Sequence, residues 1–159
     1  MPGQARASAQ AKAKAPASEV IILRTIYYHE VNAIKRFDTA YIFPNLGAII
    51  YGRRGKYYVP IRGNNFIKAW VRRDGRVVIS LVKGPLYARN VRLIDDYNIS
   101  VKADPLQDFR TWTISIDSVL RTKTYRFILD DNMDELLHLL PTGQFAALLY
   151  LLFIYQHPG

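Results

Sequence analysis

The chain has 159 residues, of which 50% are hydrophobic and 13% aromatic, and it carries 22 Lys and Arg against 13 Asp and Glu. This length fits one domain with a core of its own, and the hydrophobic content excludes a wholly disordered chain. The absence of cysteine excludes disulfides, thiolate metal ligands and a thiol nucleophile. No apolar run reaches the roughly 18 residues of a membrane span. We therefore expect a soluble protein, in an intracellular or virion-associated location.

The charges are distributed unevenly along the chain. Residues 1–94 hold 17 Lys and Arg and four acids, whereas residues 95–159 hold five Lys and Arg and nine acids. A charge asymmetry of this kind recruits partners of opposite charge. The basic part therefore indicates a polyanion as partner, either nucleic acid or an anionic membrane surface. The alternative is a basic surface that serves only solubility.

Residues 1–18 have the composition of a separate N-terminal arm. Alanine occupies every odd position from Ala5 to Ala17, and the intervening residues include Arg6, Lys12 and Lys14. No large apolar side chain follows Met1, so the segment is predicted to be a disordered Ala/Lys-rich arm. It lacks the apolar stretch of a secretory signal and the amphipathic face of a mitochondrial presequence.

Residues 19–129 alternate between short runs rich in Ile, Val, Tyr and Thr and breaks at Gly, Asn, Asp and Pro, a pattern typical of strands. Strands are predicted near residues 19–28, 39–43, 48–52, 57–61, 66–72, 76–82, 87–94, 98–103, 111–117 and 123–129. The Asp74-Gly75 dipeptide predicts a hairpin with a two-residue type I′ turn, in which Val71 faces Val78 and Trp70 faces Ile79. In this pairing Trp70 is a core residue.

The last 30 residues predict two helices, at about 132–156. Asn132 and Glu135 have the spacing of a capping box before a Leu-rich run, and Thr142 can cap a second helix. Residues 145–155 contain no charged residue, so this second helix is apolar on all sides. The predicted fold class is therefore α+β, mainly β: a compact antiparallel sheet or sandwich over residues 19–159, with a C-terminal helical pair.

A helix that is apolar all round cannot bury every side against one face of a sheet, and an apolar surface left in water marks an association site. We therefore expect the protein to be a homo-oligomer with this segment at the subunit contact. The residues assigned to self-association are Leu148, Leu149, Leu151, Leu152 and Phe153. The alternatives are burial inside the chain itself and an in-plane membrane anchor.

The sequence offers few groups for catalysis, and we expect no enzyme activity, no catalytic residues, no metal site and no cofactor. No second histidine lies at metal-ligand spacing from His29, and His138 lies alone in a Leu-rich helix. The Asp130-Asp131 pair precedes a helix, where negative charge is favoured by the helix dipole. No nucleophile-elbow, phosphate-loop or dinucleotide motif occurs in the strand–turn–helix context that it requires.

Two basic turns are the candidate site. If the strands between residues 48 and 82 run up and down in sequence, the turns near 53–56 and 73–76 emerge at the same end of the sheet. The residues assigned to nucleic-acid binding are Arg53, Arg54, Lys56, Arg72, Arg73 and Arg76. Such a cluster favours phosphate groups as ligands. The alternative is that these loop tips are basic for solubility.

A cationic arm, a β-rich domain and an apolar end are common among small viral structural proteins. The predicted function is a non-enzymatic protein that binds nucleic acid through phosphate contacts and self-associates, as a small capsid, nucleocapsid or matrix-like component does. The first alternative is a peripheral, matrix-like protein that binds anionic lipid with the same cations. The second is a basic subunit of a large ribonucleoprotein particle.

Overall fold

A computed structural model describes residues 18–30, 32–107 and 110–155. The fold is mostly β, with 52% of the residues in strands, two sheets and two C-terminal helices, which confirms the predicted α+β, mainly β class. The arm predicted at residues 1–18 lies outside the described residues except for Ser18, which begins the first strand.

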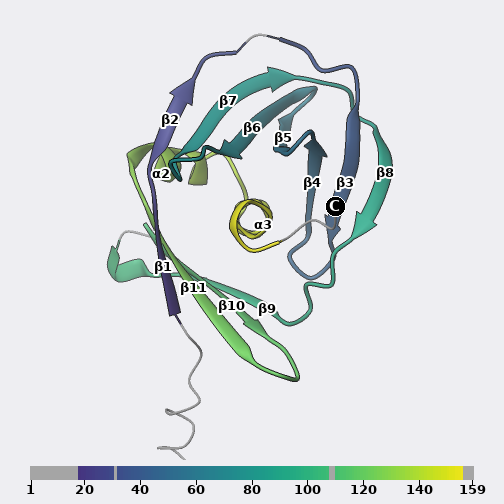
Figure 1. The fold of residues 1–159 in the computed structure, drawn as a ribbon. Coiled ribbons are helices and arrows are strands. Elements are labelled where there is room, and N and C mark those ends of the chain that lie inside the picture. The colour runs from purple at the N-terminus through teal and green to yellow at the C-terminus, as the bar shows by residue number, and fades with distance from the viewer. Residues whose placement is uncertain (1–17, 31, 108–109, 156–159) are drawn as a thin grey trace, which may run out of the picture.

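The elements follow one another in chain order as strands first and helices last (Figure 1). The strands are β1 (Ser18–Leu23), β2 (Thr25–Tyr28), β3 (Phe37–Phe43), β4 (Ala48–Arg53), β5 (Lys56–Arg62), β6 (Asn65–Val71), β7 (Val77–Lys83), β8 (Ala88–Leu93), β9 (Ile99–Ala103), β10 (Thr111–Asp117) and β11 (Thr122–Leu129). A short 3-10 helix, η1 (Pro105–Gln107), joins β9 to β10, and the helices α2 (Asp131–Leu137) and α3 (Thr142–Phe153) complete the chain.

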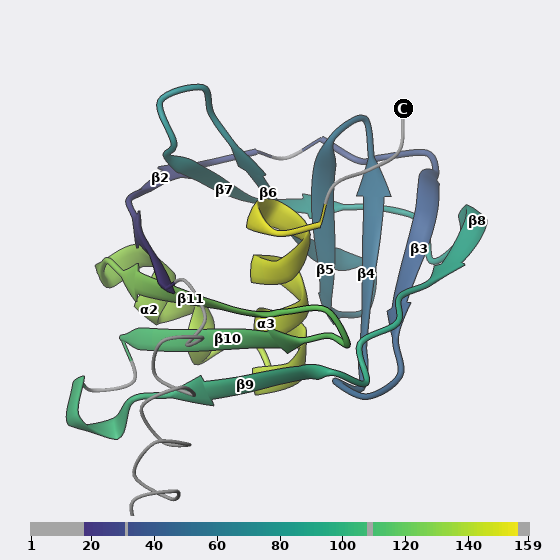
Figure 2. The ribbon, with the colours of Figure 1, turned by 60° about the horizontal axis from the view of Figure 1, so that its bottom comes forward.

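The strands form a four-stranded sheet, in the order β1-β11-β10-β9, and a seven-stranded sheet, in the order β2-β7-β6-β5-β4-β3-β8. The predicted strand 19–28 is therefore two strands in different sheets, divided at Arg24. β1 pairs in parallel with β11, and β2 pairs in parallel with β7. In Figures 1 and 2 the two sheets curve around α3, which lies at the centre of the molecule.

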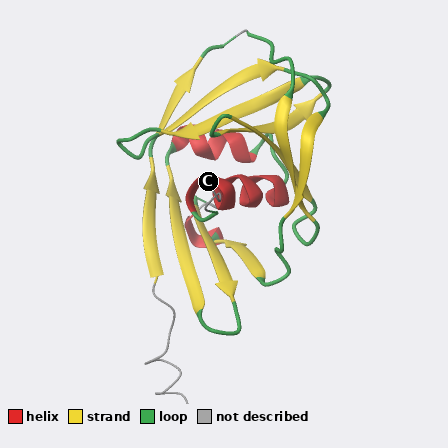
Figure 3. Ribbon diagram, turned by 45° about the vertical axis from the view of Figure 1, so that its right-hand side comes forward, coloured by secondary structure: helices red, strands yellow, loops and turns green. Residues whose placement is uncertain are grey.

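Helix α3 is the centre of the main hydrophobic core. Six of its residues are buried, namely Phe145, Ala146, Ala147, Leu148, Leu149 and Leu151. They pack with the inward side chains of both sheets, including Ile50, Ile67 and Phe127. A helix that is apolar all round requires apolar neighbours all round, and the two curved sheets supply them (Figure 3).

This arrangement corrects the premise on which self-association was assigned. Leu148, Leu149 and Leu151 are buried within their own chain, and Leu152 and Phe153 pack half-buried against the same core. The premise was a sheet on one side of the helix, whereas strands of two sheets pack around it. Leu148, Leu149 and Leu151 are therefore enclosed in this core, whereas Leu152 and Phe153 stay partly exposed. No helix of the described residues is long and apolar enough to cross a membrane.

A second, smaller cluster covers the outer face of the seven-stranded sheet. Phe37, Tyr58, Phe66 and Val82 are buried there, with Ile34 packed against them. Ile34 belongs to the connection between β2 and β3, and Phe37 is the first residue of β3. The end of this connection therefore covers the outer face of β5, β6 and β7. The outer face of the β6–β7 hairpin is therefore covered at the Phe66–Val82 pair, and the next pair on this face is polar, Lys68 with Ser80.

Asp130 connects helix α2 to the junction between β1 and β2. Its carboxylate accepts the Thr25 N–H at 2.6 Å, the Thr25 hydroxyl at 2.5 Å and the Met133 N–H at 3.1 Å. Asp130 is thus the N-cap of α2, and the prediction of a capping box that begins at Asn132 is wrong. Helix α3 begins at Thr142, and its N-cap is Pro141 rather than Thr142.

Replacing Asp130 with Ala removes these three hydrogen bonds together. We expect Asp130→Ala to lower the free energy of unfolding by about 2–3 kcal/mol. The loss of the helix N-cap and the loss of the acceptor for the part-buried Thr25 N–H both contribute to this cost. The matched control is Asp131→Ala, which removes the same charge from the first turn but breaks only an exposed ion pair with Arg110. Its expected cost is about 0.5 kcal/mol. Urea unfolding of both variants distinguishes the two, and equal losses would contradict the assigned cap.

Candidate nucleic-acid interface

The β4–β5 turn is built in a conformation that arginine rarely adopts. Arg54 has φ +50° and Gly55 has φ +76°, and Arg53 pairs with Lys56 on either side of them. Two positive φ angles in a two-residue loop are the signature of a type I′ turn. A left-handed conformation costs a side-chain-bearing residue roughly 1 kcal/mol. Arg54 is the one residue other than glycine with positive φ among the described residues.

The β6–β7 turn differs from the prediction by one residue. Val71 pairs with Val77 and Trp70 with Val78, and the Arg72 N–H donates to the Arg76 carbonyl at 2.8 Å. Of the Asp74-Gly75 pair only Gly75 has positive φ, at +86°, so the type I′ prediction at this dipeptide is wrong. The loop has one residue more, so the register shifts by one and Trp70 faces Val78 instead of Ile79.

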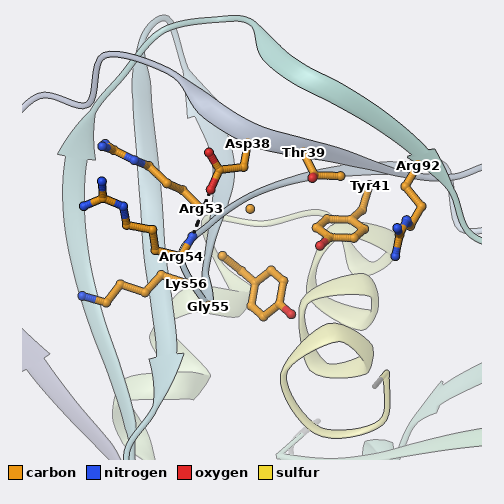
Figure 4. A pocket seen from close by; sticks show the side chains of 10 residues that line it. Asp38, Thr39, Tyr41, Arg53, Arg54, Gly55, Lys56 and Arg92 are labelled. Atoms are coloured by element: carbon orange, nitrogen blue, oxygen red, sulfur yellow. Dashed lines mark hydrogen bonds between the residues drawn. The ribbon is translucent and has the colours of Figure 1, made fainter. Parts of the chain in front are cut away.

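Arg53, Arg54 and Lys56 form no ion pair with any carboxylate of the described residues. In the described part of the chain, no carboxylate oxygen lies within 4.0 Å of the charged nitrogens of these three side chains. The carboxylate of Asp38 accepts the backbone N–H of Arg54 at 3.3 Å. Figure 4 shows the three basic side chains extending to the same side of the turn. The three cations of this turn, Arg53, Arg54 and Lys56, are called the β4–β5 cation cluster below.

Trp70 links this cluster to the outer face of the sheet. The Nζ of Lys56 lies 4.6 Å from the centre of the Trp70 ring, and the Nζ of Lys68 lies 5.1 Å from it. Tyr28 packs edge-on against the same ring, with 6.3 Å between centroids. The ring therefore limits the positions that Lys56 can take, by a cation–π attraction of about 0.5–1 kcal/mol. Trp70 is half-buried here rather than a core residue.

Lys68 differs from the three cations of the turn because it is buried and paired. Its Nζ donates to both carboxylate oxygens of Glu30 at 3.0 and 3.1 Å, and Glu30 also accepts the Ser80 hydroxyl at 3.0 Å. This ion pair ties the connection after β2 to the middle of the sheet. Lys68 therefore contributes little net charge to the surface.

Two open cavities flank the β4–β5 turn. One, of about 330 Å³, lies between the turn, Asp38, Tyr41, Tyr57 and Arg92. The other, of about 230 Å³, lies between the turn and the segment at Glu30 to Ile34, and Tyr58 and Lys68 also line it. All three residues of the β4–β5 cation cluster border both cavities. Burial raises the pKa of Tyr58 to about 12, against the opposing attraction of Arg53, so its hydroxyl stays protonated at neutral pH.

The six basic residues assigned from the sequence lie on two turns at one end of the sheet, as the alternating strand order requires (Figure 2). They are not equivalent. Arg72 and Arg76 share Asp74, at 3.6 and 3.8 Å, whereas Arg53, Arg54 and Lys56 have no such partner among the described residues. The two turns belong to the neighbouring hairpins β4–β5 and β6–β7 of the seven-stranded sheet. Of the two turns, the β4–β5 turn therefore carries more positive charge without an ion-pair partner among the described residues.

Three residues that line the cavities beside this turn were not predicted from the sequence: Asp38, Lys68 and Arg92. Arg92 lies on β8, which pairs in parallel with β3, and its guanidinium donates to the Tyr155 hydroxyl at 3.0 Å. In Figure 4 it lies on the far side of the turn from the β4–β5 cation cluster. A parallel pairing between strands far apart in sequence leaves no local signal, so this neighbour could not be foreseen.

Among the residues that the structure describes, no group of three or more His, Asp or Glu is placed to hold a metal ion. Comparisons with family models, with curated proteins and with solved structures find no significant match to this chain.

Proposed function

We propose that the protein binds nucleic acid through the phosphate backbone, with the β4–β5 cation cluster as its principal contact and the β6–β7 turn as a secondary one. The observation that carries the proposal is a single turn with three cations that form no ion pair within residues 18–30, 32–107 and 110–155 and that border two open cavities. Like charges held together without a counter-charge repel one another, and phosphate groups relieve that repulsion. Phosphate contacts of this kind give affinity that is independent of base sequence.

The conformation of Arg54 supports a binding role for this turn. Glycine at this position would adopt the left-handed conformation without cost, and the sequence has arginine there instead. Strain of this kind is concentrated at functional sites. Self-association through α3, which the sequence suggested, is not part of the proposal because three of the residues assigned to it, Leu148, Leu149 and Leu151, are buried in their own chain.

The test compares two triple variants of equal charge. Arg53, Arg54 and Lys56 are replaced by Ser in one variant, and Arg72, Arg73 and Arg76 are replaced by Ser in the other. We expect the first to bind nucleic acid more weakly and to flatten the slope of log K against log salt by about 2–3, because each phosphate contact contributes about 0.9. The second should change the slope by less, since Asp74 already neutralises part of its charge. Gel-shift titrations over a range of salt concentrations measure both.

Arg54→Gly separates binding from stability. The substitution removes one cation and relieves the left-handed strain, so we expect weaker nucleic-acid binding together with a free energy of unfolding higher by about 0.5–1 kcal/mol. Liposome flotation on the same preparations is the companion measurement. The proposal would be overturned if the β4–β5 triple variant bound nucleic acid with unchanged affinity. It would also be overturned if this variant lost binding to vesicles but not to nucleic acid.

A further inference from the structure

Two aromatic rings meet on the outer face of the seven-stranded sheet. Tyr28 of β2 packs edge-on against Trp70 of β6, with 6.3 Å between ring centroids. Strand β7 lies between β2 and β6, and it places Val78 beside Trp70 and Ser80 beside Tyr28. Val78 is 6% exposed and Ser80 is fully buried. Because these two side chains are small, rings from strands that do not pair with each other can meet above β7.

The two rings face away from the main core and reach solvent. Ala69, next to Trp70 in the chain, belongs to the main core, and successive side chains of a strand point to opposite faces. The same alternation separates Tyr28 from Tyr27, whose partner in β7 is the core residue Ile79. Tyr28 is 50% exposed and Trp70 is partly exposed. Tyr28 therefore presents an aromatic surface to solvent, on a ring that Trp70 holds in position.

Cations lie directly beside this aromatic pair. The Nζ of Lys56, which belongs to the β4–β5 cation cluster, is 4.6 Å from the centre of the Trp70 ring. Trp70 is also two residues from Arg72, which follows β6 in the β6–β7 turn. The aromatic pair therefore adjoins both basic turns.

Carboxylates beside the two turns reduce this positive charge without cancelling it. Glu30 pairs with the buried Lys68, Asp74 is shared by two arginines of its own turn, and Asp38 accepts the backbone N–H of Arg54. These three carboxylates face seven cations, which are Arg53, Arg54, Lys56, Lys68, Arg72, Arg73 and Arg76. The excess positive charge favours an anionic ligand along the turns.

We propose that the nucleic acid bound at these turns is single-stranded, with a base stacked on Tyr28 and its phosphate groups on the β4–β5 cation cluster and the β6–β7 turn. Unpaired bases stack on exposed aromatic side chains, whereas the bases of a duplex are paired and stacked on one another. The Trp70 ring lies between Tyr28 and Lys56, so one strand can place a base and a neighbouring phosphate at the two positions. The inference rests on the proposed function and adds to it the class of nucleic acid.

The first test compares three probes by gel shift with the full chain: a single-stranded oligonucleotide, the duplex of the same sequence, and a single strand of the same length made of abasic nucleotides. The abasic strand keeps the phosphates and lacks the bases. We expect the single strand to bind at least about fivefold more tightly than the abasic strand, because stacking on an aromatic ring contributes at least that factor. We also expect it to bind more tightly than the duplex.

The outcomes separate this inference from the proposed function. An abasic strand that binds as tightly as the intact one, or a duplex that binds more tightly than the single strand, would overturn the inference and leave phosphate binding in place. Absence of binding to all three probes would overturn both.

The second test removes the aromatic ring. Tyr28→Ala should weaken binding of the single strand at least about fivefold and leave binding of the abasic strand unchanged, whereas Tyr28→Phe should bind as the wild type does. The matched control is Tyr27→Ala, because Tyr27 is 47% exposed on the other face of the same strand. Melting temperatures of the two alanine variants check that both are folded. A folded Tyr28→Ala variant with the affinity of the wild type would contradict stacking on this ring.

Tryptophan fluorescence of the wild type reports the position of the base. The chain has two tryptophans, of which Trp112 is 3% exposed in the main core and Trp70 adjoins Tyr28. A base on Tyr28 lies beside the Trp70 ring, so the single strand should quench the fluorescence and the abasic strand should not. Binding of the single strand without quenching would place the bases elsewhere and would overturn the inference.

Discussion

Gly143→Ala is expected to lower the free energy of unfolding by about 3 kcal/mol or more. A Cβ at this position would lie 2.0 Å from the backbone carbonyl oxygen of Leu46, in the turn between β3 and β4. That turn cannot move aside easily. The buried carboxylate of Asp96 accepts the N–H of Asn45 at 3.0 Å and the N–H of Leu46 at 2.9 Å, which fixes the carbonyl in place.

The sign of this effect is the informative part of the measurement. In an exposed helix, replacing glycine by alanine stabilises by up to about 1 kcal/mol, because alanine has the higher helix propensity. Thr142→Ala is the control, since Thr142 is exposed one residue earlier in α3, and we expect it to change stability by less than about 0.5 kcal/mol. A stabilised Gly143→Ala variant in urea unfolding would contradict the close approach of α3 to the β3–β4 turn.

Leu149→Ala is expected to lower the free energy of unfolding by about 2–5 kcal/mol while the mass in light scattering stays that of the wild type. Leu149 is fully buried in α3, among side chains from both sheets, so its truncation leaves a cavity in the main core. Leu149→Glu is expected to prevent folding, because the carboxylate would be enclosed by the apolar side chains of the main core.

The exposed Leu139, at 55% exposure, is the matched control for Leu149. Leu139→Ala should cost less than about 1 kcal/mol. The outcome that contradicts the enclosed helix is a Leu149→Ala variant of normal stability and reduced mass. That result would return this segment to a subunit contact, as the sequence first suggested.

The positions of most strands were predictable from the sequence alone. The runs of β-branched and aromatic residues near 39–43, 66–72 and 111–117 correspond to β3, β6 and β10, because these residues fit a pleated, half-buried surface. The C-terminal helices were predictable for a similar reason. Their leucine spacing and the break at Pro141 are local signals, whereas Gly143 lies inside α3 and does not break it.

Turn types and pairing register were less accessible to sequence reasoning. Asp74-Gly75 has the composition of a type I′ turn, and the structure places that turn type at Arg54-Gly55 instead. The arginine at this position carries no propensity signal for a left-handed conformation. It is held there by the short connection between β4 and β5, whose register the neighbouring strands determine.

The basic turns were correctly placed at one end of the sheet, because consecutive antiparallel strands alternate in direction. The sequence did not predict which of the basic side chains form ion pairs with carboxylates. Asp74 lies two residues from each of its partners, Arg72 and Arg76, but the pairing of Lys68 with Glu30 spans 38 residues. Long-range pairs of this kind depend on how the connection after β2 folds over the sheet.

The sequence by itself determined the β-rich composition, the uneven charge and a C-terminal helix with no polar face. Only the tertiary structure decided what covers that helix. An apolar surface has no directional preference, so its sequence is equally compatible with a subunit contact, a membrane and a core. The choice is made by the parallel pairings of β1 with β11 and of β2 with β7, which join the chain's beginning to its later strands and complete the two sheets around α3. Those contacts connect residues that are far apart in the chain, and no local pattern encodes them.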